Sequence, residues 1–377
     1  MAGPLDGLKI IELAGIGPGP YACMLLADLG ADVLRVTRGV ADIDPTTDSG
    51  VLNRSRYSVA LNLKSDAGRE LVLQLCEKAD ALIEGFRPGV TERLGLGPRE
   101  VLQRNPRLVY GRVTGYGQEG PMSQRAGHDI NYISVSGALW PMGRVGERPV
   151  PPLNLVGDYG GGSLFLALGV VSAVLSARVS GEGQVVDAAM VDGSASMTAA
   201  MHSLLDAGSW LEERGVNLLD TGAHFYEVYE TKDQRYMAVG AIEARFYAEL
   251  LRGLGIEDVS LPAQMDRSHW PMMKQYFADL FADKTREEWT EIFSDVDACV
   301  TPVLSPREAV IHPYNAKRNV FISDGGAQPQ PAPRFSKTVA TIRQLVNEPG
   351  SDMNFGLASW GIGEERQKSL RVSGAFV

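Results

Sequence analysis

The first 120 residues alternate between short apolar runs and segments whose apolar residues recur at helical spacing. Strand-like runs lie at 8–14, 31–36, 58–64, 81–86 and 107–113. Helical patterns separate them at 21–30, 65–79 and 98–105. Largely apolar strands that alternate with helices are typical of a parallel sheet covered on both faces. The alternation therefore predicts an α/β fold with a large, doubly wound, Rossmann-like domain.

The pattern changes further along the chain. Residues 1–190 are expected to form the large α/β domain, with one helix after Gly127 and a long helix after Asp158, and residues 191–224 to form linker helices. Alternation on both sides of a turn at 232–234 predicts a β-hairpin, and helical patterns follow it. Residues 225–310 are therefore expected to form a smaller α+β domain. A proline-rich linker and a last amphipathic helix are expected within residues 311–377.

Charge and cysteine content narrow the classes of protein to which the chain can belong. It has 36 basic and 46 acidic residues, a net charge of −10, which disfavours a nucleic acid or an anionic membrane surface as partner. Cys23, Cys76 and Cys299 are spaced neither for a disulfide framework nor for a metal site, and a reducing compartment is expected. The longest apolar stretch, 164–177, is shorter than the about 20 residues of a membrane span. We therefore expect a soluble, cytoplasmic protein with no metal and no membrane partner.

The first strand is followed by a glycine-rich turn that resembles a dinucleotide-binding turn. Its third glycine is replaced by Pro20, and no acidic residue ends the second strand to hold a ribose diol. Arg35 and Arg38 stand there instead, and guanidinium groups suit a phosphate. A nicotinamide-dependent dehydrogenase is therefore disfavoured, although a solvated surface arginine is an equally good interpretation of this segment alone.

Further basic residues recur near the ends of the predicted strands. They are Arg54, Arg56, Lys64, Arg87 and Arg93. In an open α/β sheet the ligand crevice lies outside the carboxyl ends of the strands. Several cations at that edge of a net-acidic protein predict a small polyanionic ligand, such as a nucleotide with several phosphates.

Two residues are candidates for acid–base chemistry in the large domain. His128 follows a glycine and precedes Asp129 at the expected start of a helix, where the helix dipole favours a neutral imidazole. Asp158 precedes three glycines and a long apolar helix. A structural histidine and a helix N-cap are the competing interpretations. Glycines in a first turn indicate close approach to the backbone, so the amides of 158–161 are expected to hold an oxyanion.

A third candidate, Glu243, lies where the predicted hairpin meets a helix. Its competing interpretation is a favourable charge at a helix start.

The segments that contain these residues resemble the family III CoA-transferase superfamily and, within it, the α-methylacyl-CoA racemases. AGHDINY (126–132) is the most diagnostic segment, and others are LDGLKIIELAGIGPGPYACMLLADLGADVLRVTR, GFRPGVTERLGLGP, PLNLVGDYGGG, GEGQVVDAAMVDG, AVGAIEARFY, DACVTPVL and PAPRFS. They occur in the family's order over nearly the whole chain. The chain departs from the superfamily at 339–361, which lacks a Gly-any-His-Thr stretch, and at the variable loop 39–50.

The resemblance implies an interlocked homodimer whose large domain includes both chain ends, so that residues 311–377 return to complete it. It implies a 2-methylacyl-CoA substrate and neither a metal nor an added cofactor. His128 and Asp158 match the two acid/base residues, Asp129 the carboxylate beside the histidine, and Glu243 the carboxylate that hydrogen-bonds the histidine. The positions that match CoA-contacting residues are Arg38, Leu61, Asn62, Leu63, Lys64, Gly85, Phe86, Arg87, Arg93, Gly127, Asp129, Ile130, Asn131 and Tyr132.

The implied activity is interconversion of (2R)- and (2S)-2-methylacyl-CoA through an enolate, with His128 and Asp158 as the two bases. The alternative within the superfamily is CoA transfer through an anhydride on Asp158, but the transferases lack the AGHDINY signature. A non-catalytic CoA-binding protein is a third hypothesis, disfavoured by the joint presence of His128, Asp158 and Glu243.

Overall fold

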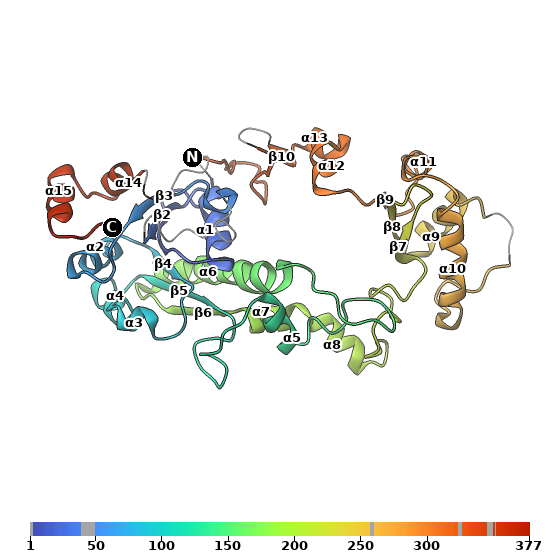
Figure 1. Cartoon of the computed structure of the whole chain (residues 1–377), viewed down its shortest axis with the longest axis horizontal. Coiled ribbons are helices and arrows are strands. Elements are labelled where there is room, and N and C mark those ends of the chain that lie inside the picture. The colour runs from blue at the N-terminus through green and yellow to red at the C-terminus, as the bar shows by residue number, and fades with distance from the viewer. Residues whose placement is uncertain (1–2, 39–49, 257–259, 323–325, 345–349, 351) are drawn as a thin grey trace. The chain divides into compact units, whose positions relative to one another are not determined.

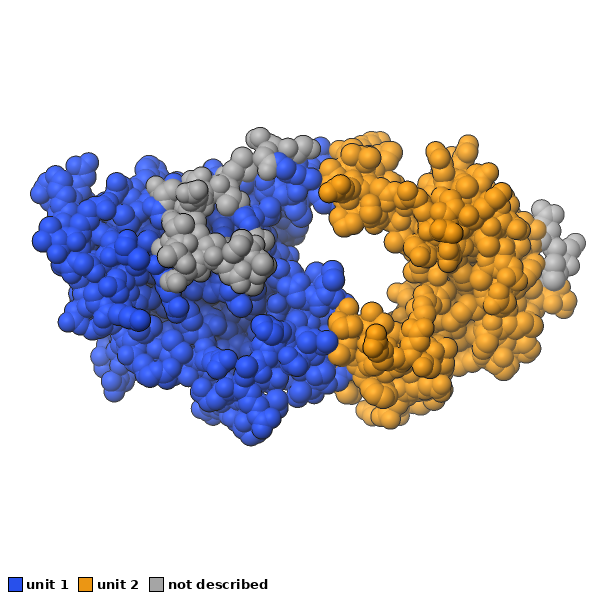
Figure 2. Space-filling view, in the orientation of Figure 1, with its two compact units in different colours: residues 1–137, 152–198, 319–377 blue, residues 138–151, 199–318 orange. Residues whose placement is uncertain are grey.

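The computed structural model of the 377-residue chain (Figure 1) describes residues 3–38, 50–256, 260–322, 326–344, 350 and 352–377. The chain divides into two compact units (Figure 2). Unit 1 consists of 1–137, 152–198 and 319–377, and unit 2 of 138–151 and 199–318. These borders differ from the sequence-based ones at 190 and 311. Most of the variable loop 39–50, and 345–349 with 351 in the divergent segment, lie outside the described residues.

Unit 1 is built on a six-stranded parallel sheet of order β3-β2-β1-β4-β5-β6. The strands are β1 (Lys9–Leu13), β2 (Asp32–Thr37), β3 (Tyr57–Ala60), β4 (Ala81–Glu84), β5 (Val109–Thr114) and β6 (Val185–Ala189). This is the strand order of dinucleotide-binding α/β proteins, in which the chain changes direction across the sheet between β1 and β4. The predicted doubly wound α/β fold is confirmed.

Helices cover both faces of this sheet. They are α1 (Pro18–Asp28), α2 (Asp66–Cys76), α3 (Val90–Arg93), α4 (Pro98–Arg104), α5 (Asp129–Val135), α6 (Phe165–Ser180), α7 (Met190–Met197), α14 (Met353–Ser359) and α15 (Glu364–Val372), with the short η2 (Gly50–Asn53) and the strand pair β10 (Phe321–Ile322) and β11 (Gln328–Pro329). Successive strand residues alternate between two cores: Ile11 and Leu34 pack with α2 and α14, while Ile10 and Val33 pack with α1 and α6. Two buried faces explain why these strands are largely apolar, although Glu12, Arg35, Glu84 and Arg112 are charged strand residues that are buried as well.

The helix predicted after Asp158 begins earlier than expected. A π-helix, η3 (Leu155–Leu164), contains Asp158 and continues directly into α6, so Asp158 is not a helix N-cap. The combined helix has 26 residues and is the one helix of the described chain that is long and apolar enough to cross a membrane by length and composition. The prediction that this segment is too short was therefore wrong. Leu166 and Val170 of α6 are buried against the sheet, whereas Leu168 and Val179 are exposed.

Unit 2 combines a three-stranded antiparallel sheet with helices, as the sequence predicted. The strands are β7 (Tyr226–Glu230), β8 (Tyr236–Gly240) and β9 (Val300–Pro302), in that order. The helices are α8 (Ala199–Asp206), α9 (Ala244–Gly253), η4 (Arg267–His269), α10 (Trp270–Phe281), α11 (Arg286–Ile292), α12 (Pro306–Ile311) and α13 (Pro313–Arg318). An aromatic core that includes Phe225, Phe277 and Trp289 joins the sheet to α10 and α11.

The core of unit 2 contains a buried histidine that is expected to make the stability of this unit depend on pH. His224 is 1% exposed, and its Nε2 lies 2.8 Å from the Tyr247 hydroxyl. Burial, together with Lys274, lowers the pKa of His224 from 6.5 to about 4. The unfolded chain therefore binds a proton that the folded chain does not between pH 6.5 and 4, and the free energy of unfolding falls as pH falls through this range.

We expect unit 2 to lose about 2 kcal/mol of stability between pH 7 and pH 5 through this residue. Hydrogen exchange of the α10 amides at the two pH values measures the loss, and His224→Gln is the control because glutamine does not titrate. An equal loss in the variant would assign the pH dependence to other groups.

Candidate active site

A pocket of about 750 Å³ lies at the carboxyl edge of the parallel sheet, beside the neighbouring strands β1 and β4, between which the strand order reverses direction. Its walls come from the segments that follow β1, β4 and β5 and from η3. The residues that line it are Ile16, Gly17, Pro18, Leu52, Gly85, Phe86, Arg87, Pro88, Val113, Thr114, Gly115, Tyr116, Ser123, Arg125, Ala126, Gly127, His128, Asn131, Tyr132, Asn154, Asp158, Tyr159 and Met190. This is the place at which open α/β sheets bind ligands. The pocket brings together His128 and Asp158, which are 30 positions apart in the sequence.

His128 is the residue immediately before α5, and its exposed side chain lines the pocket. Its backbone is extended, and its amide donates a 3.0 Å hydrogen bond to Asn131 Oδ1. The Asn131 amide in turn donates to the His128 carbonyl oxygen at 2.8 Å. These two hydrogen bonds pair backbone N–H groups that have no partner within the first turn of a helix, and they fix the direction in which the chain enters α5.

Asp158 lies on the first half of η3 and is half-buried. Asn154, four residues earlier, donates from Nδ2 to Asp158 Oδ2 at 3.2 Å. Burial raises the pKa of Asp158, and the negative charge of Asp129 adds to the rise, whereas the Asn154 hydrogen bond and the His128 charge oppose it. A carboxyl group whose pKa is raised can carry a proton closer to neutral pH, as a residue that exchanges hydrogen with a substrate requires.

Asp129 lies beneath the pocket and links the two segments. It is 5% exposed, and its Oδ2 accepts a 2.7 Å hydrogen bond from the Asp158 amide. Burial raises the pKa of Asp129, while the amides of Asp158 and Gly157 lower it. A Cβ atom on Gly157 would lie 2.6 Å from Asp129 Oδ2, so this approach requires glycine. The carboxylate next to His128 therefore holds the backbone of Asp158 in place.

The amides of 158–161 are not the oxyanion donors that the sequence suggested. The Asp158 amide is bonded to Asp129, and the Tyr159 amide donates to the Asn154 carbonyl oxygen at 3.3 Å. A Cβ atom on Gly161 would lie 2.7 Å from the Ser194 amide nitrogen of α7. The glycines after Asp158 therefore make room for a neighbouring helix rather than for a ligand.

The predicted CoA-contacting residues divide into two groups. Gly85, Phe86, Arg87, Gly127, Asn131 and Tyr132 line the pocket. Arg38, Asn62, Leu63, Lys64 and Arg93 lie outside its lining but follow β2, β3 and β4 at the same sheet edge, as does Leu61, whose side chain is 1% exposed and belongs to the core. Ile130 is exposed on α5. The Arg38 guanidinium carbon lies 5.9 Å from the centre of the Phe86 ring.

Three of the arginines expected at the crevice are instead buried. Arg54 donates from Nη2 to Asp28 Oδ2 at 2.6 Å, and Arg56 pairs with Glu12. Arg35 Nε lies 3.8 Å from the same Glu12 carboxylate. A guanidinium group buried in a protein needs a carboxylate partner, and these partners are already in place. The prediction that these cations face a polyanion was therefore wrong.

The sequence analysis missed many of the residues that line the pocket, among them Gly17, Arg125, Asn154 and Tyr159. Gly17 has a φ of 65°, and a Cβ atom there would lie 3.1 Å from Asp158 Oδ2. Asn154 stands four residues before Asp158, and this spacing is the one sequence signal that could have placed Asn154 near the carboxylate. Glu243 belongs to unit 2, where it is the exposed residue before α9.

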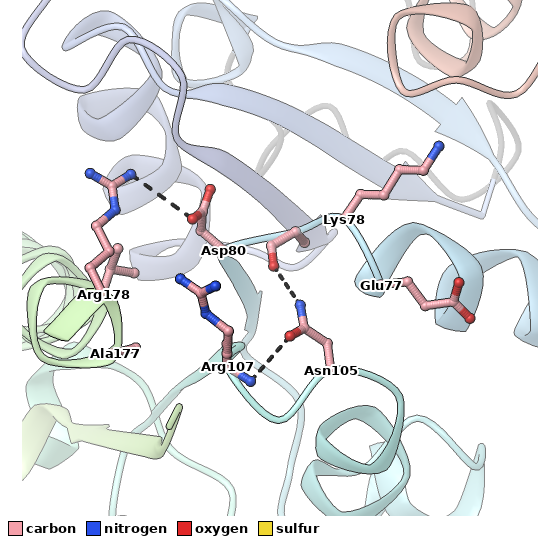
Figure 3. A pocket seen from close by; sticks show the side chains of 9 residues that line it. Glu77, Lys78, Asp80, Asn105, Arg107, Ala177 and Arg178 are labelled. Atoms are coloured by element: carbon pink, nitrogen blue, oxygen red, sulfur yellow. Dashed lines mark hydrogen bonds and ion pairs between the residues drawn. The ribbon is translucent and has the colours of Figure 1, made fainter. Parts of the chain in front are cut away.

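A second cavity, of about 260 Å³, lies at the opposite, amino edge of the sheet (Figure 3). It is lined by Lys78, Arg107 and Arg178, which could suggest a site for an anion. The carboxyl ends of α2, α4 and α6, however, all lie beside it. Basic groups stabilise the negative ends of helices, and Asn105 Nδ2 donates at 2.9 Å to the carbonyl oxygens of Cys76 and Ala79. The polar residues of this cavity therefore have a structural explanation. Within the described ranges, no group of three His, Cys, Asp or Glu residues is arranged to hold a metal.

Comparison with known proteins shows similarity over most of the chain. A model of CoA-transferase family III matches residues 5–351. Alpha-methylacyl-CoA racemases of Mus musculus and Homo sapiens are 49% and 46% identical, each over 89% of this chain and 87% of the relative. The succinyl-CoA:glutarate CoA-transferase of Homo sapiens is 26% identical over 89% of this chain and 81% of its own. A CAIB/BAIF family protein from Brucella suis, 23% identical, superimposes with a TM-score of 0.81 over 96% of this chain and 100% of that chain.

Proposed function

Because this chain belongs to CoA-transferase family III, we propose that it is an isomerase that interconverts (2R)- and (2S)-2-methylacyl-CoA thioesters. The observation that carries the proposal is the placement of a histidine and an aspartate with a raised pKa in one pocket. Two groups that can each give and accept a proton are what inversion of an α-carbon needs.

In the proposed mechanism, one base removes the α-proton and the other returns a proton to the opposite face. Neutral His128 acts with protonated Asp158 in one direction, and ionised Asp158 acts with protonated His128 in the other. Asp129 holds the Asp158 backbone through the 2.7 Å hydrogen bond. We assign to Glu243 the role of orienting His128 and stabilising its imidazolium form, as the family resemblance implies. No added cofactor takes part in any step.

The enolate oxygen needs hydrogen-bond donors that the chain does not already use. The amides of Asp129 and Ile130, in the first turn of α5, have no acceptor among the described residues. They follow His128 directly and carry the positive end of the α5 dipole. We propose that they replace the amides of η3 as the oxyanion donors.

The competing function is CoA transfer, in which Asp158 would attack the thioester carbonyl and form an anhydride. Asp158 by itself is compatible with either reaction. His128 favours the racemase, because an acyl transfer through an aspartyl anhydride has no need for a second base near the α-carbon. The 49% identity to a racemase, against 26% to 32% to CoA-transferases, supports the same choice.

Incubation of the protein with (2R)-2-methylacyl-CoA in deuterated water tests the proposed function. We expect deuterium at C2 and formation of the 2S isomer without any acceptor acid. A transferase would release CoA to a carboxylic acid only when that acid is added, and would leave C2 unlabelled. Acceptor-dependent transfer without labelling would therefore replace the racemase proposal with the alternative.

We further propose that the protein is a homodimer, because α6 has an apolar face that unit 1 does not cover. Leu168, Leu175 and Val179 are 65%, 60% and 92% exposed. Mean hydropathy over 18 residues of the combined helix reaches 1.8, and 39% of that window is buried. An exposed apolar face of this size is typical of an interface, and the family resemblance implies a second copy as its occupant.

Leu168→Glu is expected to convert the dimer to a monomer, because a carboxylate in an apolar interface would be buried without a partner. Light scattering coupled to size-exclusion chromatography measures the change. Val372→Glu is the control, because it puts the same charge at an apolar position outside α6, on α15, that is 92% exposed. This variant should leave the mass unchanged. A wild-type monomer, or recovery of the chain in membranes, would contradict the proposal.

A further inference from the structure

We propose that Arg112 is a positioning residue, which holds the pocket loop 85–89 in the conformation that binds CoA. The proposal rests on the proposed function, since it assumes that this loop contacts the CoA part of the substrate. The loop supplies Gly85, Phe86, Arg87 and Pro88 to the pocket. Arg112 itself lies on β5 and is absent from the pocket lining, so it acts through other residues.

Arg112 holds the first end of the loop through Glu84. The two residues are register partners on adjacent strands, and Arg112 Nε donates to Glu84 Oε1 at 2.7 Å. The other carboxylate oxygen, Oε2, accepts the Phe86 amide at 2.6 Å. One buried carboxylate therefore joins the guanidinium to the backbone of a pocket residue.

The same guanidinium group holds the second end of the loop, at α3. Arg112 Nη1 donates to Glu92 Oε1 at 2.8 Å, and Nη2 donates to Thr91 Oγ1 at 3.3 Å. Arg112 thus bonds to residues on both sides of 85–89 with all three of its nitrogens. A further bond, from Gln124 Nε2 to the Pro88 carbonyl oxygen at 3.2 Å, ties the loop to a residue whose neighbours, Ser123 and Arg125, line the pocket.

The loop depends on these bonds because little of it is buried. Gly85 and Arg87 are exposed, Phe86 and Gly89 are half-buried, and Pro88 is the one buried residue of the five. Arg112 and Glu84, in contrast, are 6% and 1% exposed. Hydrogen bonds between charged groups that are shielded from solvent are strong and directional. The fixed part of the assembly is therefore the buried ion pair, and the exposed loop takes its conformation from it.

The expected consequence concerns binding rather than chemistry. Arg87 lines the pocket, Arg38 lies over the Phe86 ring, and Arg93 ends α3. The hydrogen bonds of Arg112 therefore support a segment that carries or contacts three cations, which suit phosphate groups. His128 precedes α5 and Asp158 lies on η3, whereas the hydrogen bonds of Arg112 go to Glu84, Thr91 and Glu92. If the loop is already ordered before the ligand binds, the free energy of binding does not include the entropic cost of ordering it.

Arg112→Met tests the proposal, because methionine keeps much of the side-chain volume and removes the donors. We expect the Kd for CoA, measured by calorimetry without turnover, and the KM for 2-methylacyl-CoA each to rise at least tenfold. The kcat should stay within threefold of the wild type. Asp28→Asn is the matched control: it disrupts another buried arginine–carboxylate pair, with Arg54, away from the pocket lining, and should leave both Kd and KM unchanged.

Glu92→Gln keeps the test decisive if Arg112→Met does not fold. The Glu92 side chain is 42% exposed, so the substitution leaves no buried unpaired acid, and by removing the charge of the acceptor it weakens only the bonds at the α3 end of the loop. We expect a threefold to tenfold rise in the Kd for CoA. A Kd within twofold of the wild type, or a fall in kcat with Kd unchanged, would overturn the proposal. Because CoA binding is measured directly, a wild type that binds CoA but does not racemise would refute the proposed function alone.

Discussion

His128→Ala should lower the rate of epimerisation by about 10²- to 10⁴-fold, since a positioned acid–base group contributes on that scale. The variant should nevertheless exchange the α-proton of one enantiomer, because Asp158 remains and can remove a proton and return deuterium on its own face. Asp158→Ala should show the mirror result, with exchange of the other enantiomer only. Proton NMR of each enantiomer in deuterated water measures both quantities.

The pair of variants tests the geometry as well as the identity of the bases. If both variants exchange the same enantiomer, the two side chains act on one face of the α-carbon and a two-base inversion is wrong. If His128→Ala epimerises at the wild-type rate, His128 has no part in the reaction. Circular dichroism of both variants checks that the fold is retained, which is expected because neither side chain belongs to a hydrophobic core.

Gly17→Ala is expected to reduce kcat by about tenfold, because the added Cβ atom forces the proposed catalytic carboxylate to move by a few tenths of an ångström and a shift of about 1 Å can cost about 10²-fold. The added Cβ atom would lie 3.1 Å from Asp158 Oδ2, and the φ of 65° is unfavourable for alanine. Both effects displace either the Asp158 carboxylate or the turn that faces it. Steady-state kinetics with the 2R substrate measures the change.

Gly15→Ala provides the control for this substitution within the same turn. A Cβ atom on Gly15 would meet nothing within 4 Å, and Gly15 does not have a positive φ. Its kcat should therefore stay close to the wild-type value. If both alanine variants lose activity equally, the effect comes from stiffening of the turn rather than from contact with Asp158.

The fold of unit 1 was predictable because its information is local. The four inner strands β2, β1, β4 and β5 are buried on both faces, so their apolar runs are visible without knowledge of their neighbours. The helices between the runs carry their own periodicity. The π-helix was not predictable in the same way. Its hydrogen bonds span one residue more than those of an α-helix, and the pattern of 155–164 does not reveal that difference, so Asp158 was assigned to a helix start.

The residues proposed for acid–base chemistry were predictable from the sequence. Which of the basic residues face the pocket, and which are buried in ion pairs, was not. His128 and Asp158 stand in motifs that identify them, and the sheet topology brings both to one pocket. Arg54 and Arg87 look alike in the sequence, since each is a basic residue near a strand. Only the tertiary structure shows that Arg54 has a buried carboxylate, Asp28, on α1 as partner while Arg87 lines the pocket.

The hydrogen bond between Asp129 and the Asp158 backbone has a consequence for how such an enzyme diversifies. Asp129 follows His128 directly, so in the proposed mechanism this bond helps to set the gap that hydrogen crosses between the two faces of the substrate. Residues that touch only the acyl tail lie outside this link and can change without altering the gap. Tail preference and stereochemical inversion are thus separable traits, and a lineage can acquire new substrates while its inversion step stays intact.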